Sequence, residues 1–446
     1  MKKIKYIISL CCCAIILMGF GACRKTEFMP DPEGAQVPYV NNATKTVEEL
    51  LTASSAKIFL TAWQKSNIKA LLKAKGAKVS YTVFALSDAA MQSAGLTANV
   101  IAQMPVNEVD SLMMFYTSIG DLSKESLASR NESSMVKTML NRPGLYAAYY
   151  EGDGTGQQQY DLYYYRHYIA LKNDELLING KSTGKVNYTQ AKDGALYVID
   201  KAVEKAHKSA LRTLEEDGRF TIFLEAQRIA DELYVEKIAS DIEPFFGYKP
   251  DAEEIKTVYA TERKYYEMGW ALNRPPYPGF VGKNVDVTTM FAPTDDAFRK
   301  AGFQTAADVI KFNERGEGVR FDDNTFQAAG SYPMDSVFTY HRDWGRMFGT
   351  KDPSYGLGAP NATVFFSNDL QPNLLNEYYV NIGGSASPKY GYKMPLEFSL
   401  DGNTVKIKVK GSEHTAASVT QTDINTMNGP IHVIDHLLFP KGFKLK

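Results

Sequence analysis

The chain has 446 residues, of which 44% are hydrophobic and 12% aromatic, values typical of a globular protein rather than of a long disordered chain. At about 100–200 residues per domain, this length predicts two to three domains. The 50 basic residues balance 51 acidic ones, so we expect no nucleic-acid partner, because such a partner normally needs a basic face.

The first 22 residues have the order of a secretory signal peptide. Three lysines come first, an apolar run over 7–22 follows, and two small residues stand directly before Cys23. The stretch Phe20-Gly21-Ala22-Cys23 resembles a bacterial lipobox. We therefore expect cleavage after residue 22 and acylation of Cys23, palmitate included. The lipid would hold the chain on the outer membrane, facing the periplasm or the cell surface. The alternative is an uncleaved transmembrane anchor, because the apolar run is nearly long enough to span a bilayer.

Cysteine usage restricts the chemistry of the mature chain. The other three cysteines, Cys11 to Cys13, lie inside the signal peptide, so only the acylated one would remain. This predicts no disulfide, no thiol catalysis and no cysteine-ligated zinc. Residues 23–43 contain several prolines and few apolar residues, which predicts a flexible tether spanning roughly 25 Å.

The rest of the chain contains an internal repeat. Four segments of the first copy match four of the second in the same order: 58–60 with 222–224, 81–91 with 288–298, 110–112 with 335–337, and 194–200 with 429–435. The repeat predicts one domain over 44–207 and another over 208–446. The separation between matched residues rises from 164 to 207 after the first match. The second copy therefore carries a 43-residue insertion, placed at about 238–286.

The second match predicts a strand, a stop and a capped helix. Residues 289–292 have the pattern of a short apolar strand, Pro293 cannot continue the hydrogen-bond ladder, and Thr294 is a good N-cap. Asp295 and Asp296 follow in the first helical turn, where they complement the helix dipole. Near the end of each copy, Asp193-Gly194 and Asn428-Gly429 predict turns with positive φ before a buried strand. These motifs indicate folding rather than catalysis.

These residues also carry a resemblance to a known family. Residues 289–298 resemble the first signature of fasciclin domains, 422–424 with 428–435 resemble the second, and Tyr340-His341 resembles the Tyr-His motif between them. The first copy keeps both signatures in weaker form, with Leu86 in place of the proline and Phe115-Tyr116 in place of Tyr-His. The resemblance implies an α+β fold of two tandem domains, each a β-sheet wedge flanked by helices. It implies adhesion or matrix binding, without enzyme activity or a cofactor.

Two patterns raise chemical alternatives. His432 and His436 would share one face of a strand, with His341 in reach, and a metal site needs three such ligands. Tyr116 and Tyr197 stand at the positions of His341 and His432 in the first copy, which favours buried hydrogen bonding over metal ligation. The stretch 180–184 matches the Gly-x-Ser-x-Gly pattern of a hydrolase, but a polar strand follows it instead of the required helix. We therefore interpret that stretch as a turn.

Aromatic residues gather in two segments that lack a counterpart in the other copy. Eight tyrosines between 146 and 168 flank a glycine-rich tip, which predicts a long hairpin. The adjacent Tyr163, Tyr164 and Tyr165 cannot all face the core. The insertion predicts a helix over 253–270 and a stiff loop over 274–279, and its Trp270, Arg274 and Tyr277 are candidate ligand contacts. For both segments the alternative is packing within the domain.

The prediction for function is a lipid-anchored adhesion or binding protein that recognises a protein or a glycan. The alternative is an accessory subunit of an outer-membrane nutrient-uptake complex that docks onto a transporter. A hydrolase is the weakest hypothesis, because the chain has few histidines and lacks a nucleophile elbow in the required context.

Overall fold

The computed structural model describes residues 41–76, 78–150, 158–259, 281–342, 363–381 and 391–445. The chain divides into two units, Met1–Asn42 and Ala43–Lys446, and nearly all of the described residues belong to the second. The signal peptide, Cys23 and almost all of the tether lie outside the described residues. Among the helices of the described ranges, none has both the length and the apolar composition needed to cross a membrane.

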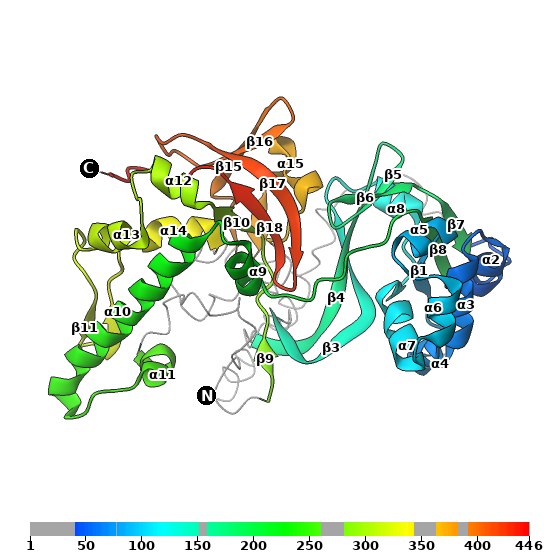
Figure 1. The fold of residues 1–446 in the computed structure, drawn as a ribbon, viewed down its shortest axis with the longest axis horizontal. Helices are drawn as coiled ribbons and strands as arrows, with labels where there is room; N and C mark the ends of the chain where they lie inside the picture. The colour runs from blue at the N-terminus through cyan, green and yellow to red at the C-terminus, as the bar shows by residue number, and fades with distance from the viewer. Residues whose placement is uncertain are drawn as a thin grey trace, which may run out of the picture. The chain divides into compact units, whose positions relative to one another are not determined.

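The first copy combines short helices with a mixed sheet. In chain order its described elements are α2 (Val47–Ala53), α3 (Lys57–Lys65), α4 (Ile68–Ala74), β1 (Tyr81–Leu86), α5 (Asp88–Ser93), α6 (Ala98–Gln103), α7 (Val106–Phe115), β2 (Thr117–Ile119), α8 (Lys124–Ala128), β3 (Ser134–Tyr150), β4 (Gln158–Lys172), β5 (Glu175–Ile178), β6 (Lys181–Lys185), β7 (Tyr188–Ala191) and β8 (Gly194–Ile199). Figure 1 shows α2 to α7 gathered around β1 and β8, while β3 and β4 extend as a long ribbon. The long hairpin predicted from the tyrosines is confirmed.

Within the sheet of the first copy, β1 and β8 form a buried parallel pair. The strand order is β6-β5-β4-β3-β2-β1-β8-β7, and the short β9 (Lys283–Asn284) pairs with β3. β1 and β8 run parallel, from Tyr81 opposite Gly194 to Leu86 opposite Ile199. All of β8 and all but the first residue of β1 are buried, as expected for parallel strands that are apolar on both faces.

The second copy repeats this parallel pair of strands. Its described elements are α9 (Ala210–Asp217), α10 (Thr221–Phe246), α11 (Ala252–Glu254), a π-turn (Ile255–Tyr259), β9, β10 (Met290–Pro293), α12 (Asp295–Lys300), α13 (Ala306–Asn313), β11 (Arg320–Asp322), β12 (Gln327–Ala329), α14 (Asp335–Arg342), a 3-10 turn (Ser367–Asp369), α15 (Pro372–Leu375), β13 (Tyr379–Asn381), β14 (Gly391–Lys393), β15 (Leu396–Asp401), β16 (Thr404–Val409), β17 (Ala417–Thr426) and β18 (Gly429–Ile434). The main sheet has the order β10-β18-β17-β16-β15, and β10 and β18 again run parallel.

The capped helix after the first strand is confirmed in both copies. Ser87 and Thr294 cap α5 and α12 by accepting from the backbone N–H three residues on. The aspartate that follows each cap has a further role, which local sequence patterns do not reveal. Asp88 accepts a hydrogen bond from the backbone N–H of Ile58 at 2.7 Å, and Asp295 accepts one from Ile222 at 2.8 Å. In each copy, this aspartate therefore links the first turn of α3 or α10 to the junction between the first strand and the capped helix.

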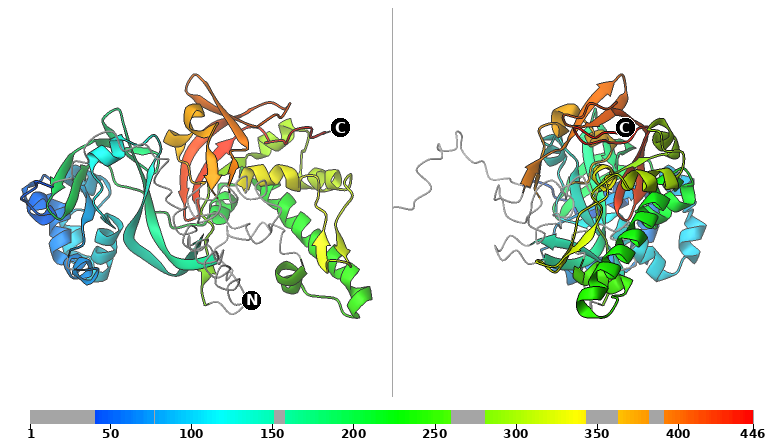
Figure 2. Two further views of the ribbon diagram at one scale, coloured as in Figure 1. Left: turned by 180° about the vertical axis from the view of Figure 1, so that it is seen from behind. Right: turned by 90° about the vertical axis from the view of Figure 1, so that its left-hand side faces the viewer.

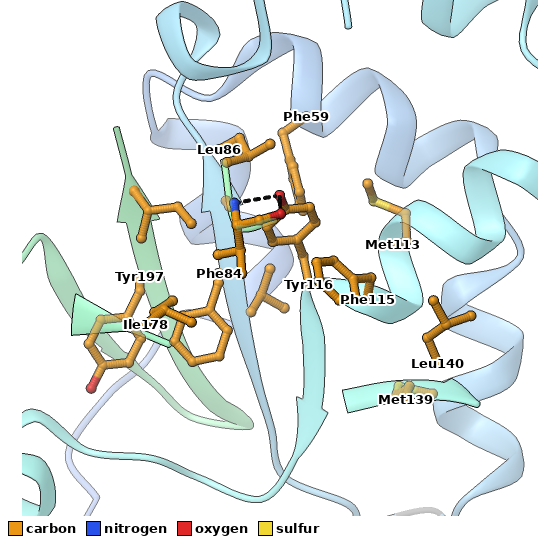
Figure 3. Packing of buried hydrophobic residues seen from close by; sticks show 14 of the residues in the cluster. Phe59, Phe84, Leu86, Met113, Phe115, Tyr116, Met139, Leu140, Ile178 and Tyr197 are labelled. Carbon is orange, nitrogen blue, oxygen red and sulfur yellow. Dashed lines mark hydrogen bonds between the residues drawn. The ribbon is translucent and has the colours of Figure 1, made fainter. Parts of the chain in front are cut away.

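The two copies have separate hydrophobic cores. The first is built around Phe59, Phe84, Phe115 and Tyr116, which Figure 3 shows packed between the helices and β1. Its residues from the first copy run from Val47 to Ala206, and the core of the second copy begins at Ala210. The boundary at 207/208 expected from the repeat stays a prediction, because Ala43–Lys446 forms one compact unit. Val285 and Met427 of the second copy also join the first core.

The insertion differs in part from its prediction. α10 continues to Phe246, whereas its counterpart α3 has nine residues, so the insertion begins as an extension of that helix (Figures 1 and 2). The helix predicted over 253–270 is confirmed in its first part, where the α-helical turn Ala252–Glu254 continues into a single π-helical turn, Ile255–Tyr259. Residues 260–280 lie outside the described part.

Candidate functional site

His341 on α14 uses both ring nitrogens inside the second copy. Nδ1 lies 2.8 Å from the carbonyl oxygen of Phe291, and Nε2 lies 3.1 Å from the backbone nitrogen of Leu438. A carbonyl oxygen only accepts and a backbone N–H only donates, so Nδ1 carries the proton and Nε2 accepts. Burial lowers the pKa of this imidazole to about 4, which keeps it neutral.

His432 on β18 is held in the same way. Its Nε2 donates to the carbonyl oxygen of Phe365 at 2.9 Å, and its Nδ1 accepts from the backbone N–H of Asp423 at 3.4 Å. The ring is fully buried and stacks on Phe291 with ring centroids 5.8 Å apart. Burial lowers the pKa of His432, although the nearby Asp423 carboxylate opposes that shift.

In the first copy, tyrosines make the equivalent bonds. The hydroxyl of Tyr116 accepts from the backbone N–H of Val203 at 3.0 Å, and that of Tyr197 donates to the carbonyl oxygen of Leu122 at 2.8 Å. Tyr197 also stacks on Phe84, 5.4 Å between centroids, as His432 stacks on Phe291. The prediction that this His/Tyr exchange serves buried hydrogen bonding is confirmed.

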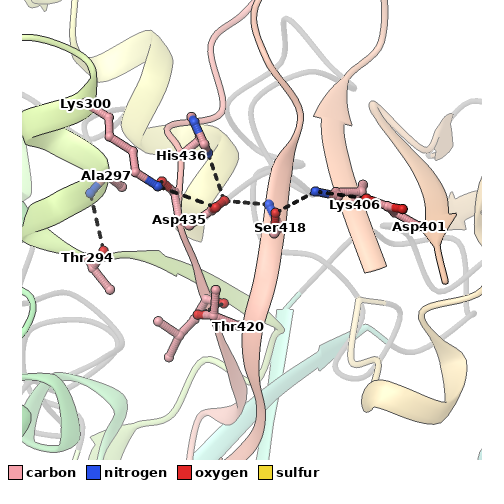
Figure 4. Close-up of polar contacts among 10 residues, drawn as sticks. Thr294, Ala297, Lys300, Asp401, Lys406, Ser418, Thr420, Asp435 and His436 are labelled. Carbon is pink, nitrogen blue, oxygen red and sulfur yellow. Dashed lines mark hydrogen bonds and ion pairs between the residues drawn. The ribbon is translucent and has the colours of Figure 1, made fainter. Parts of the chain in front are cut away.

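His436 does not share a strand face with His432, because β18 ends at Ile434. Its Nδ1 lies 2.8 Å from Oδ1 of Asp435 instead. Asp435 also accepts from the backbone N–H of Ser418 at 2.7 Å and lies 3.5 Å from Nζ of Lys300, as Figure 4 shows. These contacts connect α12, β17 and the end of β18, which is a structural role. The described ranges contain no cluster of three His, Cys, Asp or Glu side chains suited to a metal ion.

The Gly-x-Ser-x-Gly stretch does not form a nucleophile elbow. Asn179 and Gly180 form the turn between β5 and β6, and Lys181–Lys185 is strand β6. No helix follows, since β7 comes next and pairs with β8. Ser182 therefore lacks the strand-turn-helix context that a hydrolase serine needs.

A surface of aromatic side chains lies where α10 ends. We call it the aromatic tip and define it by six residues: Phe245, Phe246, Tyr248, Tyr259, Phe321 and Phe326. Phe321 is its buried centre at 7% exposure, whereas Phe245 and Phe326 are 56% and 54% exposed. Centroid distances of 5.7–6.5 Å link the rings around Phe321 and Phe246. Exposed and contiguous aromatic surface is typical of binding sites.

The backbone builds this tip from two segments. Gly247 ends α10 in a left-handed conformation, with φ of 72°, and leads the chain to Tyr248. The hydroxyl of Tyr248 donates to Glu254 at 2.5 Å and lies 3.2 Å from that of Tyr259, which fixes both rings. The β11–β12 hairpin supplies Phe321 and Phe326. Phe326 has a φ of 55°, a rare conformation for a bulky residue that costs about 1–3 kcal/mol.

The candidate residues from the sequence fall into three groups. Cys23, Trp270, Arg274 and Tyr277 lie outside the described residues. Tyr163 and Tyr165 are buried at 5% and 8% exposure, and their rings meet edge to face at 5.6 Å, so they belong to the core. Tyr164 is only half-buried on the other strand face, with Nζ of Lys137 6.0 Å from its ring centroid. Of the three, only Tyr164 is available to a ligand.

The sequence pattern did not indicate that Phe321 and Phe326 belong to a binding surface. They lie more than 60 residues beyond the end of α10 and outside the insertion. The turn-forming run Asp322-Asp323-Asn324 signals a hairpin there, but no local pattern indicates that this hairpin packs against α10.

Among the comparisons with known proteins, one family model matches part of the second copy. A family model described as "Fasciclin domain" matches residues 367–440. Among solved structures, a FAS1 domain pair from the insect cell adhesion molecule fasciclin I is 13% identical, covering 87% of this chain and 98% of its own. Its TM-score of 0.26 is too low to support an argument. No curated protein matches the chain.

Proposed function

We propose that this chain, a member of the fasciclin domain family with two tandem fasciclin-like domains, is a binding protein that recognises a protein or a glycan at the cell envelope. Fasciclin domains are associated with cell adhesion and binding. In this proposal Cys23 is acylated and anchors the protein to the outer membrane, and the chain carries no enzyme activity.

The observation that carries the proposal is the aromatic tip. Residues common to both copies have structural roles, since they cap helices, fill cores or hold buried backbone groups. The described residues of the first copy form no such tip, because α3 ends where α10 continues. Its Phe326 combines high exposure with an unfavourable backbone conformation, two costs that folding alone does not require. The surface is therefore suited to contact with a partner.

The binding test uses the purified mature chain on an array of glycans and matrix proteins. Phe245→Ala and Tyr248→Ala remove rings of the tip and should weaken binding about thirtyfold each, the effect typical of an aromatic hot spot. Leu233→Ala is the matched control, because Leu233 is 45% exposed on the same helix but outside the tip. Equal affinity of the tip variants and the control would exclude the tip as the binding surface.

Residues outside the tip form the second arm of this test. Trp270, Arg274, Tyr277 and Tyr164 stay in the proposal as ligand contacts, and each is replaced by alanine in the same assay. A loss of affinity with an unchanged melting temperature supports a contact with ligand. If no immobilised glycan or protein binds the unmodified chain, the proposed function itself fails.

Anchoring is tested separately through Cys23. Cys23→Ala should yield a protein that no longer partitions into the detergent phase of a Triton X-114 extraction, because acyl chains account for most of the membrane affinity of such proteins. Continued partitioning, together with an intact N-terminus in mass spectrometry, would show an uncleaved transmembrane anchor instead.

A further inference from the structure

A small cavity lies where β4 of the first copy meets the end of β17 in the second. Its volume is about 20 Å³, and it is lined by Tyr163, Arg166 and Glu204 from the first copy and by Asn425 and Met427 from the second, among others. About 10–15 Å³ is enough for one water-sized occupant. The cavity therefore fits a single small species and excludes a sugar, a nucleotide or a peptide.

Arg166 brings two buried N–H groups without a hydrogen-bond partner to this cavity, among the residues that the structure describes. Its Nε and Nη1 are buried, and neither has a hydrogen-bond partner in the part of the chain that the structure describes. The guanidinium carbon lies 5.2 Å from the ring centroid of Tyr163, so the aromatic face provides only a cation–π contact. Two buried N–H groups of a guanidinium without an acceptor are costly, since arginine has donors alone and stays charged.

Among the described residues, the neighbouring side chains supply no hydrogen-bond acceptor to these N–H groups. Nη1 of Arg142 donates to Sδ of Met427 at 3.2 Å, and a thioether is a weak acceptor for a cation. Glu204 lines the cavity, but its carboxylate lies 2.9 Å from Nζ of Lys181 and is 58% exposed. Glu204, the one acidic side chain among the described residues that line the cavity, is therefore already paired on the surface.

We propose that the guanidinium of Arg166 binds a small inorganic anion of halide size, such as chloride, in this cavity. The two buried N–H groups supply charge-assisted hydrogen bonds, and the ring of Tyr163 covers one side of the guanidinium. Because residues of both copies line the cavity, the bound anion strengthens the contact between them. Binding of the anion to the folded chain alone then raises its stability with anion concentration.

The direct test is a bromide experiment on the full mature chain. Crystals grown or soaked in sodium bromide should show an anomalous peak within hydrogen-bond distance of Nε and Nη1 of Arg166. An ordered water there without anomalous signal, or a Glu204 carboxylate turned onto the guanidinium, would overturn the proposal.

The test in solution measures the melting temperature at constant ionic strength while chloride is replaced by gluconate. The unmodified chain should melt about 2–4 °C lower in gluconate, and Arg166→Met should remove that difference. Arg130→Met is the matched control, because Arg130 is an exposed arginine of the same domain outside the cavity, and it should keep the difference. If Arg166→Met does not fold, as judged by circular dichroism, the proposal is tested by two measurements on the unmodified chain. These are the dependence of its melting temperature on chloride and the anomalous bromide map. Melting independent of chloride in the unmodified chain contradicts the proposal.

Discussion

At the scale of single residues, the second copy uses neutral histidine where the first uses tyrosine. A tyrosine hydroxyl stays neutral over the whole physiological range, and burial raises the pKa of Tyr116 further, to about 12. A histidine side chain is neutral only at a pH above its pKa. The exchange therefore preserves the hydrogen bonds but gives the second copy a sensitivity to acid that these tyrosines do not confer on the first.

Buried His341 predicts a loss of stability of the second copy in acid, and burial also lowers the pKa of His167 in the first copy to about 4. The pKa of His341 is about 4 in the folded chain, against about 6.5 unfolded, so the unfolded state binds the proton more readily. The stability that the neutral ring contributes is complete above about pH 6.5 and is lost as the pH falls toward 4, by up to about 3 kcal/mol. His341→Gln, which can still accept from Leu438 and donate to Phe291, should reduce the loss over this pH range in urea unfolding, while the buried His167 and His432 retain their share.

The control for that prediction is His207→Gln. His207 is an exposed histidine between the two copies, so its replacement should leave the profile of the parent chain. A His341→Gln chain with the full parental loss between pH 6.5 and 4 would show that the ring is not the acid-sensitive group.

At the scale of elements, a strand-helix corner holds the start of a distant helix. In the second copy, Asp295 accepts from the backbone N–H of Ile222 and from the hydroxyl of Thr221 at 2.6 Å, and it is 9% exposed. α10 has no side-chain cap of its own. Asp295→Ala should therefore destabilise the second copy by about 1–2 kcal/mol, the usual effect of losing an N-cap.

The adjacent residue provides the control for this change. Asp296 lies in the same turn of α12, is 79% exposed and pairs only with Arg299 in the described structure. Asp296→Ala should change the free energy of unfolding by less than about 0.5 kcal/mol. Similar losses for both variants, measured by urea unfolding, would mean that Asp295 acts through the dipole of α12 rather than by capping α10.

The elements also show which parts of the fold can be predicted from sequence. Strand β10, its proline stop and the cap Thr294 depend on neighbouring residues, so their pattern is visible locally. Gly429 was predicted at positive φ, and its φ is 102°. A Cβ there would come within 2.4 Å of the carbonyl oxygen of Thr288, which also explains why only glycine fits.

Features that depend on contacts between distant segments could not be predicted in this way. The sequence pattern identified Asp295 as a residue of its own helix, whereas its partner Ile222 lies 73 residues away. Tyr163 and Tyr165 alternate with Tyr164 as the strand period requires, but which face is buried is decided by contacts such as that of Phe115 with Tyr165. The aromatic tip and the cavity at Arg166 also depend on contacts between segments that are distant in the sequence, so local patterns do not predict them.

At the scale of the whole molecule, the two copies are separate in their cores but joined at their contact. The ring of Tyr168 in the first copy packs on Phe366 of the second, with centroids 5.3 Å apart. Nearby, the buried Asp369 accepts from the backbone N–H of Ser133 at 3.0 Å. In addition, β9 pairs with β3 across the domain boundary. The first copy therefore depends on residues that follow it in the chain.

This arrangement predicts how the two halves behave alone. Fragments 44–207 and 208–446 should each unfold cooperatively, because each retains its own core. The first fragment should melt several degrees below the same domain in the full chain. It loses Met427 from its core, and it loses Phe366, which packs on Tyr168. Scanning calorimetry compares the two, and Phe366→Ala in the full chain should reproduce part of the loss although the change lies in the other copy. Equal melting of the fragment and of the domain in the full chain would show that the contact adds no stability, and a fragment without a cooperative transition would show that the first copy cannot fold alone.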